Sequence, residues 1–529
     1  MGVIIKGTDD TVKAADGSLS IEGFSIKTTG IGTFDGGVQV GSAATIHSNG
    51  NLGLTGIITA TNFKTGDSNV HNTGYNVGSA ITMQGNGNIA VTGIITASSY
   101  IGDGSALTGI AGTEITDSDF QVGVSTFFVD YSTGRIGINT TVPTSVLDVT
   151  GNVVVSGVCT AAAFVPSEGQ LSNRNLIING AMAVAQRATT RSTEGYTCDR
   201  WHWLRNGQDE EPTLTQHSLT TSDTGPYGVG FRKSLHLQNG NQSSGAGAAD
   251  YALIRYVIEA QDIANSGWNY KSASSYITLS FWIKSSVAQN FYCNLQSHDG
   301  TQQSYPIETG SLTADTWTKI TKTIPGLANG NIDINNDNGS GLIIDIWPFA
   351  GTSYTASGVS LNAWGAYASS SRFPDNTSTW WTTNDSTFEI TGVQLEVGSY
   401  ATPFEHRTRD DELRKCQRYF NMIGDGTNFG SQKALSDAFM WGTTECDFMY
   451  TFPVEMRTTP SLYQVTGSDY FRIQGGGNDT YIDGSFTMQY QNQRSTSQYA
   501  ASDGSRTAGA SCHITVHNSA ARYGYQAEL

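Results

Sequence analysis

The chain has 529 residues, of which 61 are glycine and only 14% are charged, a composition that favours many turns, few long helices and an all-β fold. The net charge of -17 argues against nucleic acid and anionic membranes as partners, because an acidic surface repels phosphate groups. No run of about 18 apolar residues is present, so no membrane insertion is expected.

The first 165 residues contain a repeat. Residues 40–63 read VGSAATIHSNGNLGLTGIITATNF and residues 77–100 read VGSAITMQGNGNIAVTGIITASSY, with 14 of 24 positions identical at an offset of 37. Asn49-Gly50 and Asn86-Gly87 predict hairpin turns between short strands, because both turn positions tolerate positive φ.

Each repeat is too short and too poor in apolar residues to bury a core alone. It needs neighbours, which are either stacked coils of one chain or other chains around a three-fold axis. Shorter echoes lie at 28–34 and 151–164, so the spacing of the repeat is uneven. A solenoid requires a steadier repeat, and the uneven spacing therefore favours an intertwined homotrimer.

The next segment, 166–406, contains short strands with alternating apolar residues. Ile277–Lys284, Leu342–Trp347 and Phe388–Val397 show this pattern, and Gly, Ser and Asn turns separate them. Such spacing predicts a β-sandwich. Strands rich in Tyr, Gly and Gln predict a second, small β domain over 429–529.

Between these domains, 408–422 is predicted as the one clear helix, within a connector at 407–428. Thr408 and Asp411 have the spacing of a capping box. One face of the helix is expected to pack on the sandwich or near the three-fold axis, and its members are Leu413, Cys416 and Phe420.

Four strings resemble tail-fibre (receptor-binding) proteins of tailed bacteriophages. ITASSYIGDGSALTGI (95–110) and GRIGINTTVPTSVLDVTGNVVVSG (134–157) are similar to fibre shaft repeats. ITGVQLEVGSYATPFEHR (390–407) and DDELRKCQRYF (410–420) resemble the close of a jelly-roll-like module similar to carbohydrate-binding domains. The resemblance implies a trimeric β-rich shaft at 26–165, a jelly-roll-like β-sandwich and a small distal tip domain.

The family further implies that the homotrimer attaches a virion to a host-cell surface glycan. Residues 1–25 would then dock onto other virion tail or fibre proteins. The start, MGVIIKGTDD, lacks the apolar core of an export signal, which fits a virion protein that is made in the host bacterial cytoplasm and released by lysis. A structural capsid or tail fibre without a receptor role, or a glycan depolymerase tailspike, are the alternatives.

Glycan binding requires aromatic faces and planar polar groups, and the loop Thr352–Asp385 is the best candidate. It is long and rich in Ser, Thr, Gly and Asn. Adjacent tryptophans cannot both point inward on an extended segment, so one of the pair should be exposed or meet another chain. Packing at the trimer interface is the alternative role. The candidate residues are Tyr354, Trp364, Tyr367, Trp380 and Trp381.

No catalytic motif is present, and enzyme action is not expected. Asp345, Asp385 and Glu389 could supply a pair of catalytic carboxylates, but such residues are more often turn formers or solvated. The six cysteines lack the spacing of a metal or redox site and are expected to be buried free thiols. His513 and His517 are too far apart on a strand to share one ion, so neither a metal nor a cofactor is expected.

Overall fold

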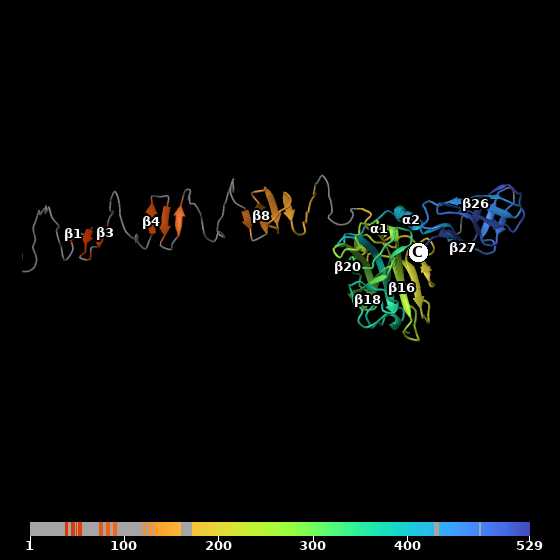
Figure 1. Ribbon diagram of the computed structural model, residues 1–529, viewed down its shortest axis with the longest axis horizontal. Coiled ribbons are helices and arrows are strands. Elements are labelled where there is room, and N and C mark those ends of the chain that lie inside the picture. The colour runs from red at the N-terminus through yellow and green to blue at the C-terminus, as the bar shows by residue number, and fades with distance from the viewer. Residues whose placement is uncertain are drawn as a thin grey trace, which may run out of the picture. The chain divides into compact units, whose positions relative to one another are not determined.

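The computed structural model describes short stretches between residues 38 and 159, and residues 172–529 apart from 329, 428–432 and 476–477. The chain divides into two compact units, Met1–Ser156 and Gly157–Leu529, which are taken separately below. Regular structure in the described residues is almost entirely β, as the composition predicted (Figure 1). No helix in these residues is long and apolar enough to cross a membrane. The expected virion-docking segment, 1–25, lies outside the described residues.

The two sequence repeats form the same small sheet. Strands β1 (Val38–Val40), β2 (Ala44–Ile46) and β3 (Leu52–Leu54) make one antiparallel meander, and β4 (Gly74–Val77), β5 (Ile81–Gln84) and β6 (Ile89–Val91) make the other. The predicted hairpin strands are confirmed, and each repeat adds a strand before them. The register is also repeated, since the partners Ile46↔Leu52 become Met83↔Ile89 at the offset of 37.

Several apolar side chains of this first unit are exposed on the single chain. Leu52 and Ile89, which occupy equivalent positions in the two repeats, are both more than half exposed. A four-stranded sheet follows in the order β10-β9-β8-β7, with Val153 and Val154 exposed beyond it. Its strands are β7 (Phe120–Val122), β8 (Phe127–Asp130), β9 (Arg135–Ile138) and β10 (Leu147–Val149).

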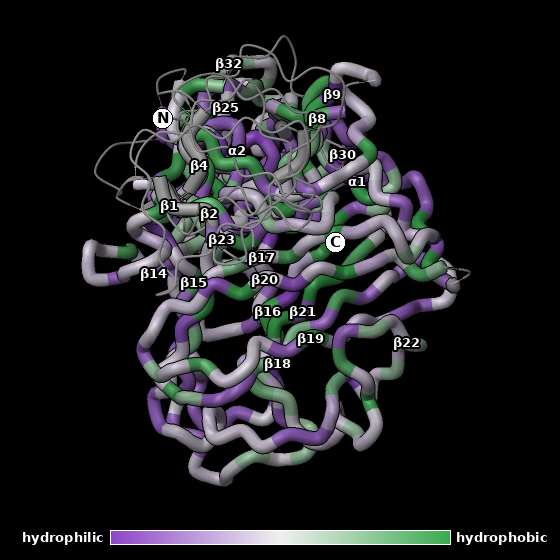
Figure 2. The backbone as a smooth tube through the Cα atoms, turned by 90° about the vertical axis from the view of Figure 1, so that its left-hand side faces the viewer, coloured by the Kyte–Doolittle hydropathy of each residue, from purple (hydrophilic) through white to green (hydrophobic). Residues whose placement is uncertain are grey.

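The second unit begins with a sandwich of two sheets around one core, and the three strands predicted there are confirmed. One sheet has the order β11 (Thr190–Arg191), β14 (Thr213–Ser218), β15 (Lys233–Gln238), β23 (Thr387–Val397), β17 (Tyr276–Ser285), β20 (Thr318–Pro325). The other has the order β12 (Gly195–Tyr196), β13 (His202–Asn206), β16 (Tyr251–Glu259), β21 (Ser340–Ala350), β18 (Asn290–Ser297), β19 (Gln303–Ser311), β22 (Gly365–Ala366). Buried hydrophobic residues of β16 and β21 belong to this core, and Figure 2 shows hydrophobic positions along both strands.

The predicted helix is shorter than expected. Helix α2 spans Arg409–Gln417, and the Thr408 hydroxyl accepts a hydrogen bond from the Asp411 N–H at 3.2 Å, which confirms the cap. Phe420 is not on the helix, because strand β24 (Phe420–Asp425) begins there and pairs with the C-terminal strand β33 (Arg522–Gln526). A second helix, α1 (Ala260–Ala264), follows β16 directly and was not predicted.

The distal β domain contains a three-stranded and a seven-stranded sheet. The order β24-β33-β27 includes β27 (Ser461–Val465). The larger sheet has the order β29 (Thr480–Ile482), β28 (Phe471–Gln474), β32 (Ser511–Val516), β25 (Lys433–Met440), β26 (Glu445–Thr451), β31 (Ser495–Ala501), β30 (Thr487–Gln491). Phe448, Phe486 and Tyr523 pack ring to ring in the core of this domain.

Buried ion pairs join the sandwich to the distal domain within the second unit. Glu259, at the end of β16, accepts hydrogen bonds from Arg418 at 2.6 Å and from the hydroxyl of Tyr419. Near the end of the chain, Glu528 pairs with the buried Arg200 at 2.6 Å. These contacts make the two domains parts of one compact body.

Candidate functional site

Trp380 and Trp381 do not offer a binding surface. Both side chains are 0% exposed, and Trp381 stacks on Phe349 with ring centroids 4.8 Å apart. Their indole N–H groups donate to the backbone carbonyls of Thr387 and Gly245. The expectation that one of the pair is exposed or meets another chain is therefore wrong, because the segment forms a turn rather than an extended strand and both rings reach the core.

The other three candidates are half-buried, and each has a partner within the chain. The Trp364 indole donates to the carbonyl of Pro325 at 2.7 Å. The Tyr367 hydroxyl accepts from the Arg372 guanidinium at 2.6 Å. The Tyr354 ring lies edge-on against Tyr251. These contacts fix the loop on the sandwich, and a glycan role for the three side chains remains a prediction.

The same loop covers part of the outer face of the β16–β21–β18 sheet. Phe373 is fully buried there against Trp347 and Tyr292. Arg372 places its guanidinium over the Trp347 ring and bonds to Asp345 at 3.2 Å. An aromatic surface that would otherwise be open is therefore filled by the chain itself.

The three carboxylates considered for catalysis have structural roles. Asp345 is fully buried and accepts two hydrogen bonds of 2.8 Å from Arg255. Glu389 is bonded by Lys284 at 2.9 Å. Asp385 has a positive φ of 53° in a turn. Asp345 and Glu389 lie in different sheets of the sandwich, so these two do not form a pair on one face.

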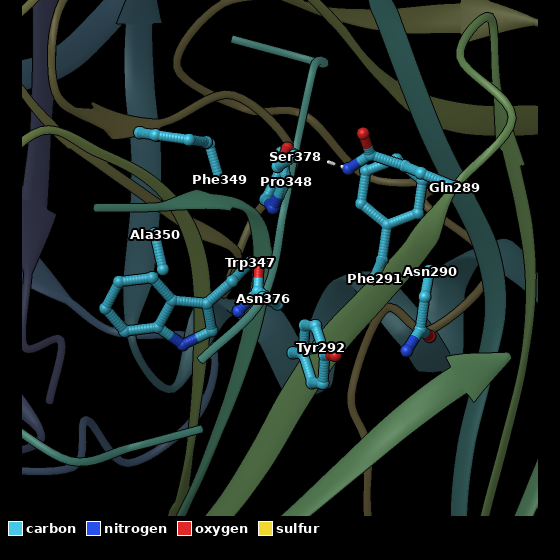
Figure 3. A pocket seen from close by; sticks show the side chains of 10 residues that line it. All are labelled: Gln289, Asn290, Phe291, Tyr292, Trp347, Pro348, Phe349, Ala350, Asn376 and Ser378. Atoms are coloured by element: carbon cyan, nitrogen blue, oxygen red, sulfur yellow. Dashed lines mark hydrogen bonds between the residues drawn. The ribbon is translucent and has the colours of Figure 1, made fainter. Parts of the chain in front are cut away.

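One of the crevices beside this loop is too small for a sugar. Figure 3 shows Trp347 and Tyr292 at its wall and the hydrogen bond from Gln289 to Ser378 across it. Its volume is about 10 Å³, which is room for a single water molecule. Ligand sites for small molecules are usually about 300–1,000 Å³.

A groove of the required size lies on the distal domain, and we call it the distal groove. Its volume is about 790 Å³. Trp441 is 69% exposed and Tyr490 is 81% exposed, so both rings offer a free face. The groove is lined by Phe439, Trp441, Glu445, Asp447, Met449, Gln489, Tyr490, Gln491, Asn492, Ser495 and Ser497.

The alternation of β26 explains which side chains enter the groove. Cys446 and Phe448 are buried in the domain core, whereas Glu445, Asp447 and Met449 point the opposite way. Pairing with β25 and β31 then places Phe439 opposite Asp447 and Ser497 opposite Met449. The sheet thus gathers residues from separate parts of the sequence on one face.

The groove carries negative charge. Asp447 is 8% exposed, and its Oδ1 has no hydrogen-bond partner among the described residues. Burial raises the pKa of Asp447, and the neighbouring Glu445 raises this pKa further. No lysine, arginine or histidine is among the lining residues that the structure describes.

Chemically, the distal groove combines the two features that sugar recognition requires. Flat aromatic faces can pack against the C–H surfaces of a sugar ring. Amide and hydroxyl groups can exchange hydrogen bonds with sugar hydroxyls. The residues that supply these polar groups are Gln489, Gln491, Asn492, Ser495 and Ser497.

Sequence reasoning missed this groove, although a signal was present. Trp441 follows a strand directly and precedes the turn Gly442-Thr443-Thr444, where a large apolar residue has no core to enter. Acidic residues at 445 and 447 then alternate with buried positions of the next strand. Exposed aromatic and acidic residues together at a hairpin indicate a site.

No group of three His, Cys, Asp or Glu side chains that could hold a metal ion occurs in the parts of the chain that the structure describes. His513 is exposed and its Nδ1 lies 2.7 Å from Asp437. His517 lies against the Tyr481 ring. All six cysteines are free thiols, and Cys159 differs from the expectation because it is exposed.

Comparison with known proteins gives no sequence family, since no family model and no curated protein matches the chain. Solved structures that are similar to parts of it include the enzymatically active domain of bacteriophage CBA120 tailspike protein 4, at 12% identity and a TM-score of 0.21 over 42% of this chain. The match covers only 21% of that tailspike chain.

Carbohydrate-binding modules are also among the similar structures. A family 11 module of Clostridium thermocellum matches at 13% identity and a TM-score of 0.18, over 42% of this chain and 99% of the module. A tandem module from Paenibacillus barcinonensis Xyn10C matches at 9% identity and a TM-score of 0.20, over 65% of this chain and 96% of that chain. At these TM-scores the likenesses carry no argument about function.

Proposed function

We propose that this protein is a bacteriophage tail fibre that attaches the virion to a bacterial surface by binding glycan in the distal groove. The observation that carries the proposal is the pair of exposed aromatic faces, Trp441 and Tyr490, beside a buried carboxylate with an unsatisfied oxygen. The sequence resemblance of the shaft repeats and of the segments at 390–407 and 410–420 to phage fibres supports the biological setting.

A homotrimer is part of this proposal. Leu52 and Ile89 are exposed at equivalent positions of the two repeats, so neighbouring chains would bury the same site along the shaft. Three identical grooves on one fibre also increase avidity, because weak single contacts add when they are tethered to one particle. Residues 1–25 would dock onto other virion tail or fibre proteins.

The test is adsorption of the full-length protein to a panel of bacterial isolates and to glycans extracted from them. Tyr490→Ala should reduce binding by about tenfold or more, because one stacking face is lost. Tyr400→Ala is the matched control, since Tyr400 is also 81% exposed and does not line the distal groove. Equal binding by the two variants would refute the groove as the receptor site.

Glycan cleavage is a second candidate function, and one observation favours it. Glu445 and Asp447 lie on the same face of β26 and both line the distal groove, so the two carboxyl groups that glycosidases use are present in one groove. Oligosaccharides released from the bound glycan would show a depolymerase, and their loss in Glu445→Gln would assign it to the groove. If the protein neither adsorbs to any isolate nor releases oligosaccharides, a structural fibre without a receptor role is indicated.

A further inference from the structure

We infer that the distal groove selects a glycan that carries a protonated amino group, and that the carboxylate of Asp447 binds this group. The inference rests on the proposed function and adds the chemical class of the ligand. It follows from three features of the groove: an unmet acceptor, an unbalanced charge and aromatic faces that suit a cation.

The unmet acceptor is Oδ1 of Asp447. The side chain is 8% exposed, so bulk water cannot solvate this oxygen fully, and no described residue donates to it. A buried polar atom without a partner is costly to folding and is therefore uncommon in proteins. Rotation of the carboxyl group would turn this oxygen toward the groove that Asp447 lines, where a ligand with an N–H or O–H donor would satisfy it.

The unbalanced charge favours an ammonium group over a hydroxyl as this donor. Glu445 lies on the same face of the same strand, and no basic residue is among the described lining residues. One hydroxyl could satisfy Oδ1 but would leave two carboxylates beside each other. An ammonium group satisfies the acceptor and offsets one of the two negative charges, whereas uronic or sialic acids would be repelled.

The aromatic faces add to this preference. Phe439 and Trp441 lie edge to face, with ring centroids 6.3 Å apart, and Tyr490 lines the same groove. A cation near an aromatic face is attracted by the ring electrons, and this attraction is largest for tryptophan. The rings therefore serve both the C–H face of a sugar and an attached ammonium group.

The experiment compares a tetramer of glucosamine with a tetramer of N-acetylglucosamine, using the full-length protein and calorimetry at a mildly acid pH where the free amine is charged. We expect the amine form to bind about tenfold more tightly. Asp447→Asn should remove this preference, because the amide keeps the shape but loses the charge. Trp441→Ala should weaken both ligands, and the amine form somewhat more, because the attraction between the ring and the ammonium group is lost as well.

Equal binding of the two tetramers by the unmodified protein would overturn the inference, as would a preference that survives in Asp447→Asn. Loss of binding on addition of EDTA would also overturn it, since a divalent cation would then occupy the acidic site. In each of these three cases, adsorption to host cells that depends on Tyr490 would leave the proposed function standing. Adsorption that depends on neither Tyr490 nor Trp441 would refute the proposed function itself.

Discussion

At the scale of single residues, tryptophan has opposite roles in the two domains of the second unit. Trp380 and Trp381 fill the sandwich core, whereas Trp441 stands on an open groove. The three differ in backbone context and not in chemistry, because a turn directs the first two inward and a hairpin end leaves the third outside. Substitution of Trp380 or Trp381 should therefore lower stability, whereas substitution of Trp441 should weaken binding.

Trp381→Ala should lower the free energy of unfolding by about 3–5 kcal/mol, because it leaves a large cavity against Phe349. Urea unfolding followed by circular dichroism measures this loss. Trp441→Ala should change stability by no more than about 0.5 kcal/mol, since the side chain is mostly exposed. A large loss of stability in Trp441→Ala would mean that its ring is packed in the assembled protein.

Substitution of Asp345 tests the role of the buried charge on the outer face of the sandwich. It neutralises Arg255 and Arg372, and Asp345→Asn should cost about 3–5 kcal/mol because two guanidinium groups lose their counter-charge. Asp333→Asn is the control, since its pair with Lys271 is more than half exposed and is worth about 1 kcal/mol or less. Similar costs for both variants in the same urea assay would contradict the role assigned to Asp345.

At the scale of elements, local signals placed the strands and the helix start but not the helix end. The Thr408–Asp411 cap is a short-range hydrogen bond that four consecutive residues can specify. The end is set by the pairing of Phe420 with Gln526, more than 100 residues away. A pattern within the helix could not include that partner, so the prediction continued to 422.

Thr408→Ala should destabilise the second unit by about 1 kcal/mol, because the Asp411 N–H loses its acceptor at the start of α2. Thr408→Ser keeps a hydroxyl at the same position and should retain nearly all of the stability. Thermal unfolding of both variants measures the difference. An equal loss in the serine variant would show that the threonine methyl group, and not the cap, matters.

At the scale of the whole molecule, the contacts of Glu259 couple the sandwich to the distal domain. Burial alone would raise the pKa of Glu259, but hydrogen bonds from Arg418 and Tyr419 outweigh it and lower this pKa below its ordinary value. A folded-state pKa below the unfolded value gives stability above the ordinary pKa of about 4.5. This stability is lost as the pH falls through the lower, folded-state pKa.

We therefore expect the two domains to unfold together at neutral pH and in separate steps in acid. Glu259→Gln should show separate steps at neutral pH, because Arg418 loses its charged partner. Denaturant unfolding, followed by tryptophan fluorescence and by hydrogen exchange of the distal strands, distinguishes one step from two. A single transition for Glu259→Gln would show that other contacts, such as Arg200–Glu528, couple the domains alone.

The proposed homotrimer is tested by the sedimentation mass of the full-length protein, which should correspond to three chains. The physical reason is the apolar surface that each short shaft sheet leaves exposed. Leu52→Asp combined with Ile89→Asp should weaken the assembly, because charges would replace the apolar contacts at equivalent positions. A mass near that of one chain for the unmodified protein would exclude the trimer.

The sequence by itself determined the features that depend on local pattern. Alternation of apolar residues gave the strands at Ile277–Lys284 and Phe388–Val397, and the offset of 37 gave two sheets with one register. The cap at Thr408 belongs to the same class. Each of these features depends on residues that are close together in the sequence, so the local pattern is enough to predict it.

Only the tertiary structure decided which side chains meet a ligand. Trp380 and Trp381 looked like a binding pair in a polar loop, but a turn directs both into the core. Tyr490 is more than 40 residues from Trp441 and Asp447 in sequence, and it meets them because β25, β26, β31 and β30 are neighbours in one sheet. The proximity of Tyr490 to the hairpin of Trp441 and Asp447 is a property of packing between distant segments, and no local pattern contains it.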